Sequence, residues 1–194
     1  FATAQYGPVS GNAKLKTALA NHMVGVYGGS IQTNNVLISA GCNQAYCLAT
    51  MALAEAGDEI ILPVPYYFNH QMWLEVLGIK AVHLGCNMSQ GGLPDIDEAR
   101  RLIGKKTKAI VLVTPNNPTG ATYPSDLLKG FFKLCQKHGI KLIIDETYKD
   151  FLTEQPPHQL FEISDWGGTL IQVYSFSKCF SLTGYRVGSV IAGE

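Results

Sequence analysis

The chain has 194 residues, of which 46% are apolar, and its 15 basic and 15 acidic side chains give a formal net charge of zero. This composition indicates an ordinary globular domain with a sizeable core. Because the charges balance and the lysines are scattered, there is no basic stripe for a phosphate backbone, and we expect no nucleic-acid partner. The longest apolar runs, such as AIVLV and EIILPV, are far shorter than the ~20 residues that span a bilayer, so no membrane segment is expected.

The five cysteines are odd in number and lack the close pairs of a zinc or redox motif. We therefore expect no metal site, and the pattern is typical of free thiols in a reducing compartment, which predicts a cytoplasmic location. The chain begins with FATAQYG and ends with VGSVIAGE. We expect it to be an internal piece of a longer protein.

Short apolar runs alternate with amphipathic stretches along the chain. Strands are expected at 35–39, 59–63, 80–85, 108–113, 141–145, 169–175 and 186–193. Helices are expected between them at 43–57, 67–78, 95–103 and 124–139. This alternation predicts an α/β fold, a three-layer sandwich in which helices cover both faces of a mostly parallel central sheet.

Polar residues follow the ends of five of these strands, in the segments AGCN, PYY, TPNNPTG, ETY and SFSK. Ligands of open α/β sheets bind beyond the carboxyl ends of the strands. Each segment alone also has a structural explanation: AGCN can start a helix, NPTG can form a turn, Asp145 can be a cap, and Tyr67 can be a half-buried aromatic residue. If these structural explanations were all correct, five strand ends would be polar by accident. We therefore expect the five segments to form one common site.

Lys178 raises the sharpest question, because it follows the apolar run TLIQVYS, and Arg186 comes eight residues later among glycines. A lysine in a packed interior costs several kcal/mol unless its amine has a use. Taken singly, Lys178 would be a solvated charge in most proteins.

The motifs NNPTG, IIDETY and SFSKCFSLTGYRVG occur in this order, preceded by YGPVSG, GCNQA and PVPYY. With them, nearly the whole chain resembles the large domain of the pyridoxal-phosphate-dependent aminotransferases of class I/II, of the aspartate aminotransferase type (fold type I). The resemblance implies that residues 1–194 are a cofactor-binding large domain that lacks an N-terminal segment and a C-terminal small domain. Lys16, where many relatives carry arginine, is a departure that bears on packing.

The resemblance also implies catalytic roles. Lys178 would form a Schiff base with the aldehyde of pyridoxal 5'-phosphate and would later move a proton between the substrate Cα and the cofactor. Asp145 would keep the pyridine nitrogen protonated, so that the ring withdraws electrons. Asn117 and Tyr148 would hydrogen-bond the ring 3-oxygen.

Further residues are implied to hold the cofactor phosphate. Arg186 would supply a bidentate guanidinium and Ser175 a hydroxyl. The backbone amides of Cys42 and Asn43 would supply the start of the helix that follows Gly41.

Two tyrosines complete the implied cofactor site. Tyr67 would stack on the ring face. Tyr6 would reach the phosphate of the neighbouring subunit, which implies a homodimer.

The arginines limit what the chain can bind by itself. Besides Arg186 there are only Arg100 and Arg101, expected on a solvated helix face, so none is left for a substrate carboxylate. In the family that arginine belongs to the small domain.

The predicted activity is amino transfer between an amino acid and a 2-oxo acid, and neither substrate can be read from the sequence. One alternative is another fold type I enzyme, such as a β-lyase or an enzyme like aminocyclopropane carboxylate synthase. The other is a non-catalytic module that retains the fold, which the presence of Lys178, Asp145 and Arg186 argues against.

Overall fold

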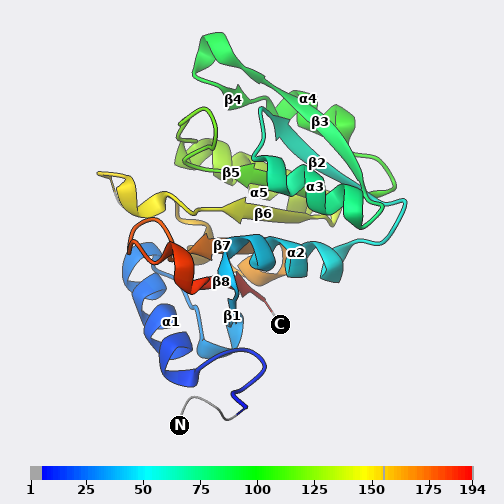
Figure 1. The fold of residues 1–194 in the computed structure, drawn as a ribbon. Helices are drawn as coiled ribbons and strands as arrows, with labels where there is room; N and C mark the ends of the chain where they lie inside the picture. The colour runs from blue at the N-terminus through cyan, green and yellow to red at the C-terminus, as the bar shows by residue number, and fades with distance from the viewer. Residues whose placement is uncertain (1–5, 155, 194) are drawn as a thin grey trace.

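Eight strands form one mixed sheet, in the order β1-β8-β7-β6-β5-β2-β3-β4, in the computed structural model, which describes residues 6–154 and 156–193 (Figure 1). Strands β2, β3, β5, β6 and β7 pair in parallel, whereas β1, β8 and β4 pair with their neighbours in antiparallel fashion. The strand bounds are Val36–Ser39 (β1), Glu59–Val64 (β2), Lys80–Asn87 (β3), Leu93–Pro94 (β4), Thr107–Val113 (β5), Lys141–Asp145 (β6), Leu170–Ser175 (β7) and Gly188–Ala192 (β8).

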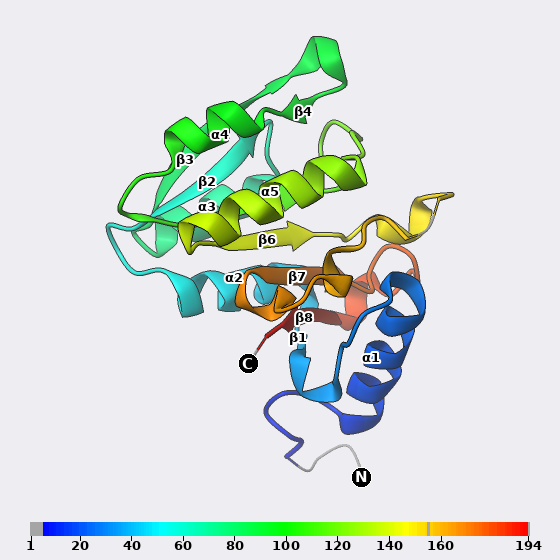
Figure 2. The ribbon, with the colours of Figure 1, turned by 180° about the vertical axis from the view of Figure 1, so that it is seen from behind.

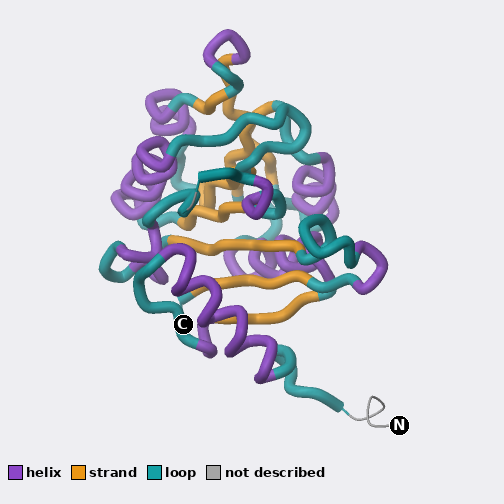
Figure 3. Tube along the Cα trace, turned by 90° about the vertical axis from the view of Figure 1, so that its left-hand side faces the viewer, coloured by secondary structure: helices purple, strands orange, loops and turns teal. Residues whose placement is uncertain are grey.

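Helices cover both faces of the sheet, as the views from behind and from the side show (Figures 2 and 3). Helices α2 and α3 lie over one face, and α1, α4 and α5 lie over the other. The helix bounds are Ala13–Tyr27 (α1), Gly41–Leu53 (α2), Phe68–Val76 (α3), Ile96–Leu102 (α4) and Ser125–His138 (α5). No helix in the described part of the chain has the length and apolar character needed to cross a membrane.

The central strands are apolar on both faces because each face meets a helix layer. In β2, Ile60 and Leu62 pack into the core under α2 and α3, while Ile61 packs into the core on the other side. In β6, Ile143 and Ile144 alternate between the two cores in the same way. The core is therefore two apolar layers separated by the sheet.

The predicted three-layer α/β architecture is confirmed, and every predicted strand and helix is present. The boundaries differ most at α2, which was predicted at 43–57 but runs over Gly41–Leu53 and ends where Ala54 turns extended. Helix α1 (Ala13–Tyr27) and the two-residue strand β4 were not predicted. Only Leu19, Ala20, Met23 and Tyr27 of α1 are buried, so the side of the helix that packs on the core is narrow.

The carboxyl ends of five strands meet at one edge of the sheet. Strand β8 lies antiparallel between β1 and β7, so β1 runs in the same direction as β7 and the other parallel strands. The start of α2 approaches β8 closely at this edge, and the approach requires glycine in β8. A Cβ added to Gly188 would lie 2.4 Å from the backbone carbonyl carbon of Gly41. The start of α2 is thereby pressed against β8.

Candidate active site

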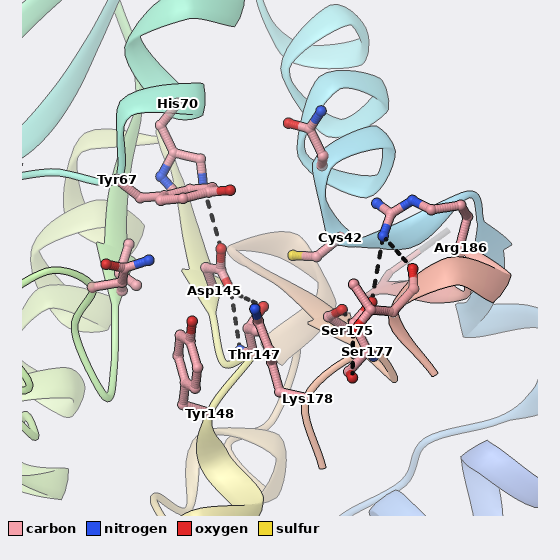
Figure 4. Close-up of a pocket in the computed structure, with 14 residues that line it drawn as sticks. Cys42, Tyr67, His70, Asp145, Thr147, Tyr148, Ser175, Ser177, Lys178 and Arg186 are labelled. Carbon is pink, nitrogen blue, oxygen red and sulfur yellow. Dashed lines mark hydrogen bonds and ion pairs between the residues drawn. The ribbon is translucent and has the colours of Figure 1, made fainter. Parts of the chain in front are cut away.

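A cavity of about 290 Å³ opens at this edge of the sheet (Figure 4). Its volume is close to the lower end of the roughly 300–1,000 Å³ that is typical of small-molecule sites. The walls come from the segments that follow β1, β2, β5, β6 and β7. The lining residues are Cys42, Asn43, Tyr67, His70, Val113, Asn117, Asp145, Thr147, Tyr148, Ser175, Ser177, Lys178, Thr183 and Arg186.

The cavity brings together the sequence-predicted site residues except Gly41 and Tyr6. Gly41 is buried just behind the wall, at the first residue of α2. Tyr6 is fully exposed and lines no part of this cavity. Its predicted contact with a neighbouring subunit stays a prediction.

Asp145, the last residue of β6, is a buried carboxylate inside the cavity. Its Oδ1 accepts hydrogen bonds from the backbone amide of Thr147 (3.0 Å) and from the Thr147 hydroxyl (2.7 Å). Burial by itself would raise the pKa of Asp145, but His70 and the two Thr147 donors outweigh it and hold the pKa below its ordinary value. Asp145 is therefore a charged acceptor at neutral pH.

His70, in the first turn of α3, supplies the partner of this carboxylate. Its Nε2 lies 3.3 Å from Oδ2 of Asp145, and both side chains are almost completely buried. The imidazole ring packs on Tyr46, with ring centroids 4.2 Å apart, and meets Tyr67 edge-on. The sequence prediction missed His70, although its position three residues after Tyr67 at a helix start was the available signal.

Arg186 places a guanidinium at the start of α2. The residue has a left-handed backbone, with φ of 53°, and its Nη1 donates to the carbonyl of Thr183 at 3.1 Å. A Cβ on Gly41 would lie 2.2 Å from Nη2 of Arg186, so a larger residue there would displace the guanidinium from its present position. A cation and the free amides of a helix N-terminus thus share one corner of the cavity.

Three hydroxyl groups lie in the same part of the cavity. Ser175 is buried at the end of β7, and its Oγ accepts from the backbone amide of Ser177 at 3.2 Å. The hydroxyl of Ser177 lies 3.4 Å from Nη1 of Arg186. Of these residues the sequence predicted Ser175 and missed Ser177 and Thr183, although all three occur in the quoted motif.

Lys178 lines the cavity and is exposed, which answers the question of its burial in favour of a solvated amine. It follows β7 in a turn at the rim, where water reaches the side chain. The buried lysine of this region is Lys149, which is 2% exposed and lies 2.8 Å from Oδ1 of Asp150. An exposed amine keeps its hydration and has access to solutes that enter the cavity.

The walls of the cavity carry three groups that can contact a flat ligand. Tyr67 is half-buried, and its hydroxyl accepts a hydrogen bond from the side-chain amide of Asn69 at 3.0 Å. Burial raises the pKa of the Tyr67 hydroxyl. Asn117 and Tyr148 line the cavity from the segments after β5 and β6. Figure 4 shows Tyr67 and Tyr148 on either side of Asp145.

Helix α2 contributes Cys42 and Asn43. The Cys42 thiol is buried, and burial together with the charge of Asp145 raises its pKa well above the ordinary value. The side chain of Asn43 accepts a hydrogen bond from the indole of Trp73 at 2.9 Å. Asn43 thereby links α2 to α3, in addition to the predicted use of its backbone amide.

These groups fit pyridoxal 5'-phosphate. The corner with Arg186, the hydroxyl groups and the start of α2 suits a phosphate, and the buried anion Asp145 suits a protonated ring nitrogen. The amine of Lys178 is accessible for bonding to an aldehyde.

Comparison with known proteins agrees with this chemistry. The family model "Aminotransferase class I and II" matches residues 2–194. The chain belongs to the class I and II aminotransferases. Enzymes of this family depend on pyridoxal phosphate.

The relatives of this aminotransferase chain include several specificities. It is 35% identical over 187 residues to the aspartate aminotransferase of Pyrococcus horikoshii, covering 96% of this chain and 48% of that protein. It is 31% identical to an aromatic aminotransferase of Arabidopsis thaliana, covering 97% of this chain and 47% of that protein. The chain spans about half the length of the curated relatives it matches.

Solved aminotransferases share the fold. A Thermus thermophilus aspartate aminotransferase mutant superimposes with a TM-score of 0.90 at 30% identity, covering 97% of this chain and 51% of the other. The alanine aminotransferase of Pyrococcus furiosus gives a TM-score of 0.88 at 30% identity, covering 96% of this chain and 47% of the other. These matches confirm the predicted fold type I architecture of the aminotransferase chain.

Proposed function

We propose that residues 1–194 are the cofactor-binding large domain of an enzyme that transfers an amino group between an amino acid and a 2-oxo acid. The observation that carries the proposal is the cavity itself, which combines the buried anion Asp145, the accessible amine Lys178 and the guanidinium of Arg186. Pyridoxal phosphate, when bound there, supplies an electron sink for the bond that breaks at the substrate Cα.

Arg186 and its neighbours hold the phosphate. The guanidinium at the start of α2 provides charge and paired donors, and the hydroxyls of Ser175 and Ser177 and the amides of Cys42 and Asn43 complete the set. Gly41 keeps the corner open. Binding at this end fixes the orientation of the whole ligand.

Asp145, supported by His70, would place a negative charge at the ring nitrogen of the cofactor. The carboxylate stays ionised because His70 and Thr147 stabilise its charged form. A fixed anion at this point keeps a proton on the ring nitrogen. Tyr67 would pack against one ring face, and Asn117 and Tyr148, which also line the cavity, would donate hydrogen bonds at the ring oxygen.

Lys178 performs the covalent and proton-transfer steps. When pyridoxal phosphate is bound, the Lys178 amine would hold it at the aldehyde carbon, and once the amino group of the substrate takes that place the released amine would accept the Cα proton. Its position at an accessible rim supports this exchange, because an incoming amine has to approach the same carbon.

We further propose that the enzyme works as a homodimer, with Tyr6 reaching the phosphate of the neighbouring subunit. The full exposure of Tyr6 supports this role, since none of the residues that the structure describes covers it. The free cysteines support a reducing, cytoplasmic location. The arginine for the substrate carboxylate comes from outside these residues, because Arg100 and Arg101 are exposed on α4.

The test is a single-turnover spectrum of the full-length protein, loaded with pyridoxal phosphate and mixed in turn with a panel of amino acids. Amino transfer converts the cofactor to its amine form and releases the matching 2-oxo acid in equal amount. Release of ammonia with the oxo acid would instead indicate a lyase. An unchanged spectrum with every amino acid would overturn the proposed activity.

A further inference from the structure

Glu146, the residue after Asp145, is completely buried on the side of the sheet away from the cavity. Its Oε2 accepts hydrogen bonds from the hydroxyl of Tyr27 (2.9 Å) and from the side-chain amide of Gln172. Nε2 of His158 lies 3.4 Å from the same oxygen. One carboxylate oxygen thus gathers side chains from α1, β7 and the segment before Leu160.

The charge state of Glu146 follows from these contacts. Burial alone would raise the pKa of Glu146, but His158, Gln172 and Tyr27 together hold it below the ordinary value. Nδ1 of His158 accepts from the backbone amide of Leu160 at 3.2 Å, so the ring proton is on Nε2, the nitrogen that lies 3.4 Å from the carboxylate. Tyr27 and Gln172 therefore donate hydrogen bonds to an ionised acceptor, and His158 lies beside it at 3.4 Å.

The backbone of Glu146 is fixed as well. Its amide donates to the carbonyl of Val173 at 3.0 Å, and its carbonyl accepts from the amide of Lys149 at 3.0 Å. Asp145 precedes it, and Thr147 and Tyr148 follow it, and these three neighbours all line the cavity. Any rotation of the Glu146 backbone would redirect the side chains on both sides of it.

Stability does not by itself call for a carboxylate here. A buried charge is costly, and replacing a buried ionic group by apolar residues of similar volume is often neutral or stabilising. The Glu146 contacts instead specify one arrangement of the turn, because Oε2 has to meet Tyr27 and Gln172 at once.

We propose that Glu146 is a positioning residue for the cofactor site. It acts through its neighbours: its side chain anchors the turn 145–149 from behind, so that Asp145 and Tyr148 face the cavity. The inference rests on the proposed function for the identity of the ligand, but the anchoring itself is a property of the cofactor-free chain.

The experiment compares Glu146→Ala and Glu146→Gln in the full-length protein. We expect Glu146→Ala to weaken binding of pyridoxal 5'-phosphate at least about 10-fold, because two buried donors lose their acceptor. In the cofactor-free protein, amide hydrogen exchange in peptides covering 146–152 should accelerate. Glu146→Gln keeps an acceptor oxygen and should stay within about threefold of the wild type.

A core variant, Leu128→Ala, separates positioning from general loss of stability. Leu128 is completely buried in α5 and lines no part of the cavity. The Leu128→Ala variant should lower the melting temperature at least as much as Glu146→Ala does. It should leave cofactor affinity and amide hydrogen exchange in residues 146–152 unchanged. If Glu146→Ala behaves like Leu128→Ala, the role of Glu146 is merely structural and the proposal fails.

Milder variants cover the case in which Glu146→Ala does not fold. Tyr27→Phe and Gln172→Met each remove one donor, and the double variant should reproduce the loss of affinity and the faster exchange. Wild-type affinity and exchange in the double variant would overturn the proposal. If the wild type binds pyridoxal phosphate but transfers no amino group, the proposed function fails while the anchoring can still be judged from affinity and exchange.

Discussion

Nε2 of His70 lies 3.3 Å from Oδ2 of Asp145, and the two side chains are 3% and 6% exposed. The pair joins the first turn of α3 to the last residue of β6, so the anion at the base of the cavity is held from two elements. Because water is excluded from both groups, their interaction is stronger than that of an exposed pair. Replacing either partner should therefore affect the chemistry of the site.

Asp145→Asn should keep the fold and the contact with Thr147 but lose the charge. We expect the rate of single-turnover amino transfer to fall about 100-fold or more, since a preorganised charge at the reacting group is lost. Stopped-flow spectra of the full-length protein measure this rate. Asp97→Asn, at an exposed position of α4, is the control and should react like the wild type. Near-normal rates for Asp145→Asn would show that Asp145 is structural.

His70→Ala should raise the pKa of Asp145, because it removes the partner that most favours the carboxylate. Loss of such a supporting partner typically costs about 10–100-fold in activity. The acid limb of the pH–rate profile should shift to higher pH. His83→Ala is the matched control, because His83 is exposed and contacts Gln71 and Tyr66 rather than the cavity. Identical profiles for the two variants would contradict the role of His70.

Acid should destabilise the protein partly through Asp145. Its folded-state pKa lies below the ordinary value, so its contribution to stability is fully present above the unfolded pKa of about 3.9 and is lost as the pH falls through the folded pKa. Urea unfolding at several pH values between about 6 and 3 should show a shallower acid loss for Asp145→Asn than for the wild type. Parallel curves would mean that the folded carboxylate is not stabilised.

Borohydride reduction of the cofactor-loaded protein, followed by peptide mapping, should label Lys178. The informative competitor is the buried Lys149, whose amine is paired with Asp150 and should remain unlabelled. Lys178→Ala should still bind the cofactor through phosphate contacts but transfer no amino group. A label on Lys149 would reverse the assignment of the two lysines.

Gly41→Ala should weaken cofactor binding, because the added Cβ would lie 2.2 Å from Nη2 of Arg186. We expect at least about a 10-fold loss, which corresponds to one displaced charge-assisted contact. Gly57→Ala is a close control, since Gly57 also has a positive φ, 91°, but nothing lies within 4 Å of its added Cβ. Both variants carry backbone strain, and only Gly41→Ala should lose affinity in a fluorescence titration.

The sheet and most of the cavity could be predicted from the sequence because both depend on short-range patterns. Apolar runs such as KAIVLV identify buried strands, and the polar residues after them fall at one edge because parallel strands share a direction. The contact partners could not be predicted in the same way. His70 reaches Asp145 only through the packing of α3 on the sheet, and Tyr27 reaches Glu146 across 119 positions of sequence.

The sequence pattern also could not predict which individual lysines are buried. Lys178 and Lys149 both follow apolar strands closely, and the sequence pattern did not decide which of the two is buried. Whether a turn directs a side chain inward depends on its backbone geometry. Lys149 is turned toward the rings of Tyr27 and Tyr174, whereas Lys178 lies at the rim.

The insertion of β8 between β1 and β7 sets an order of events during synthesis. Arg186 and the Gly188 contact with Gly41 come near the end of these residues, while the start of α2 emerges from the ribosome much earlier. The phosphate corner therefore cannot form until β8 has entered the sheet. Pairing between such distant segments is a slow step of folding. While residues 40–187 are being made, β1 therefore has no β8 to pair with. Because the phosphate corner needs β8 in place, the cofactor can bind only after β8 has joined β1 and β7.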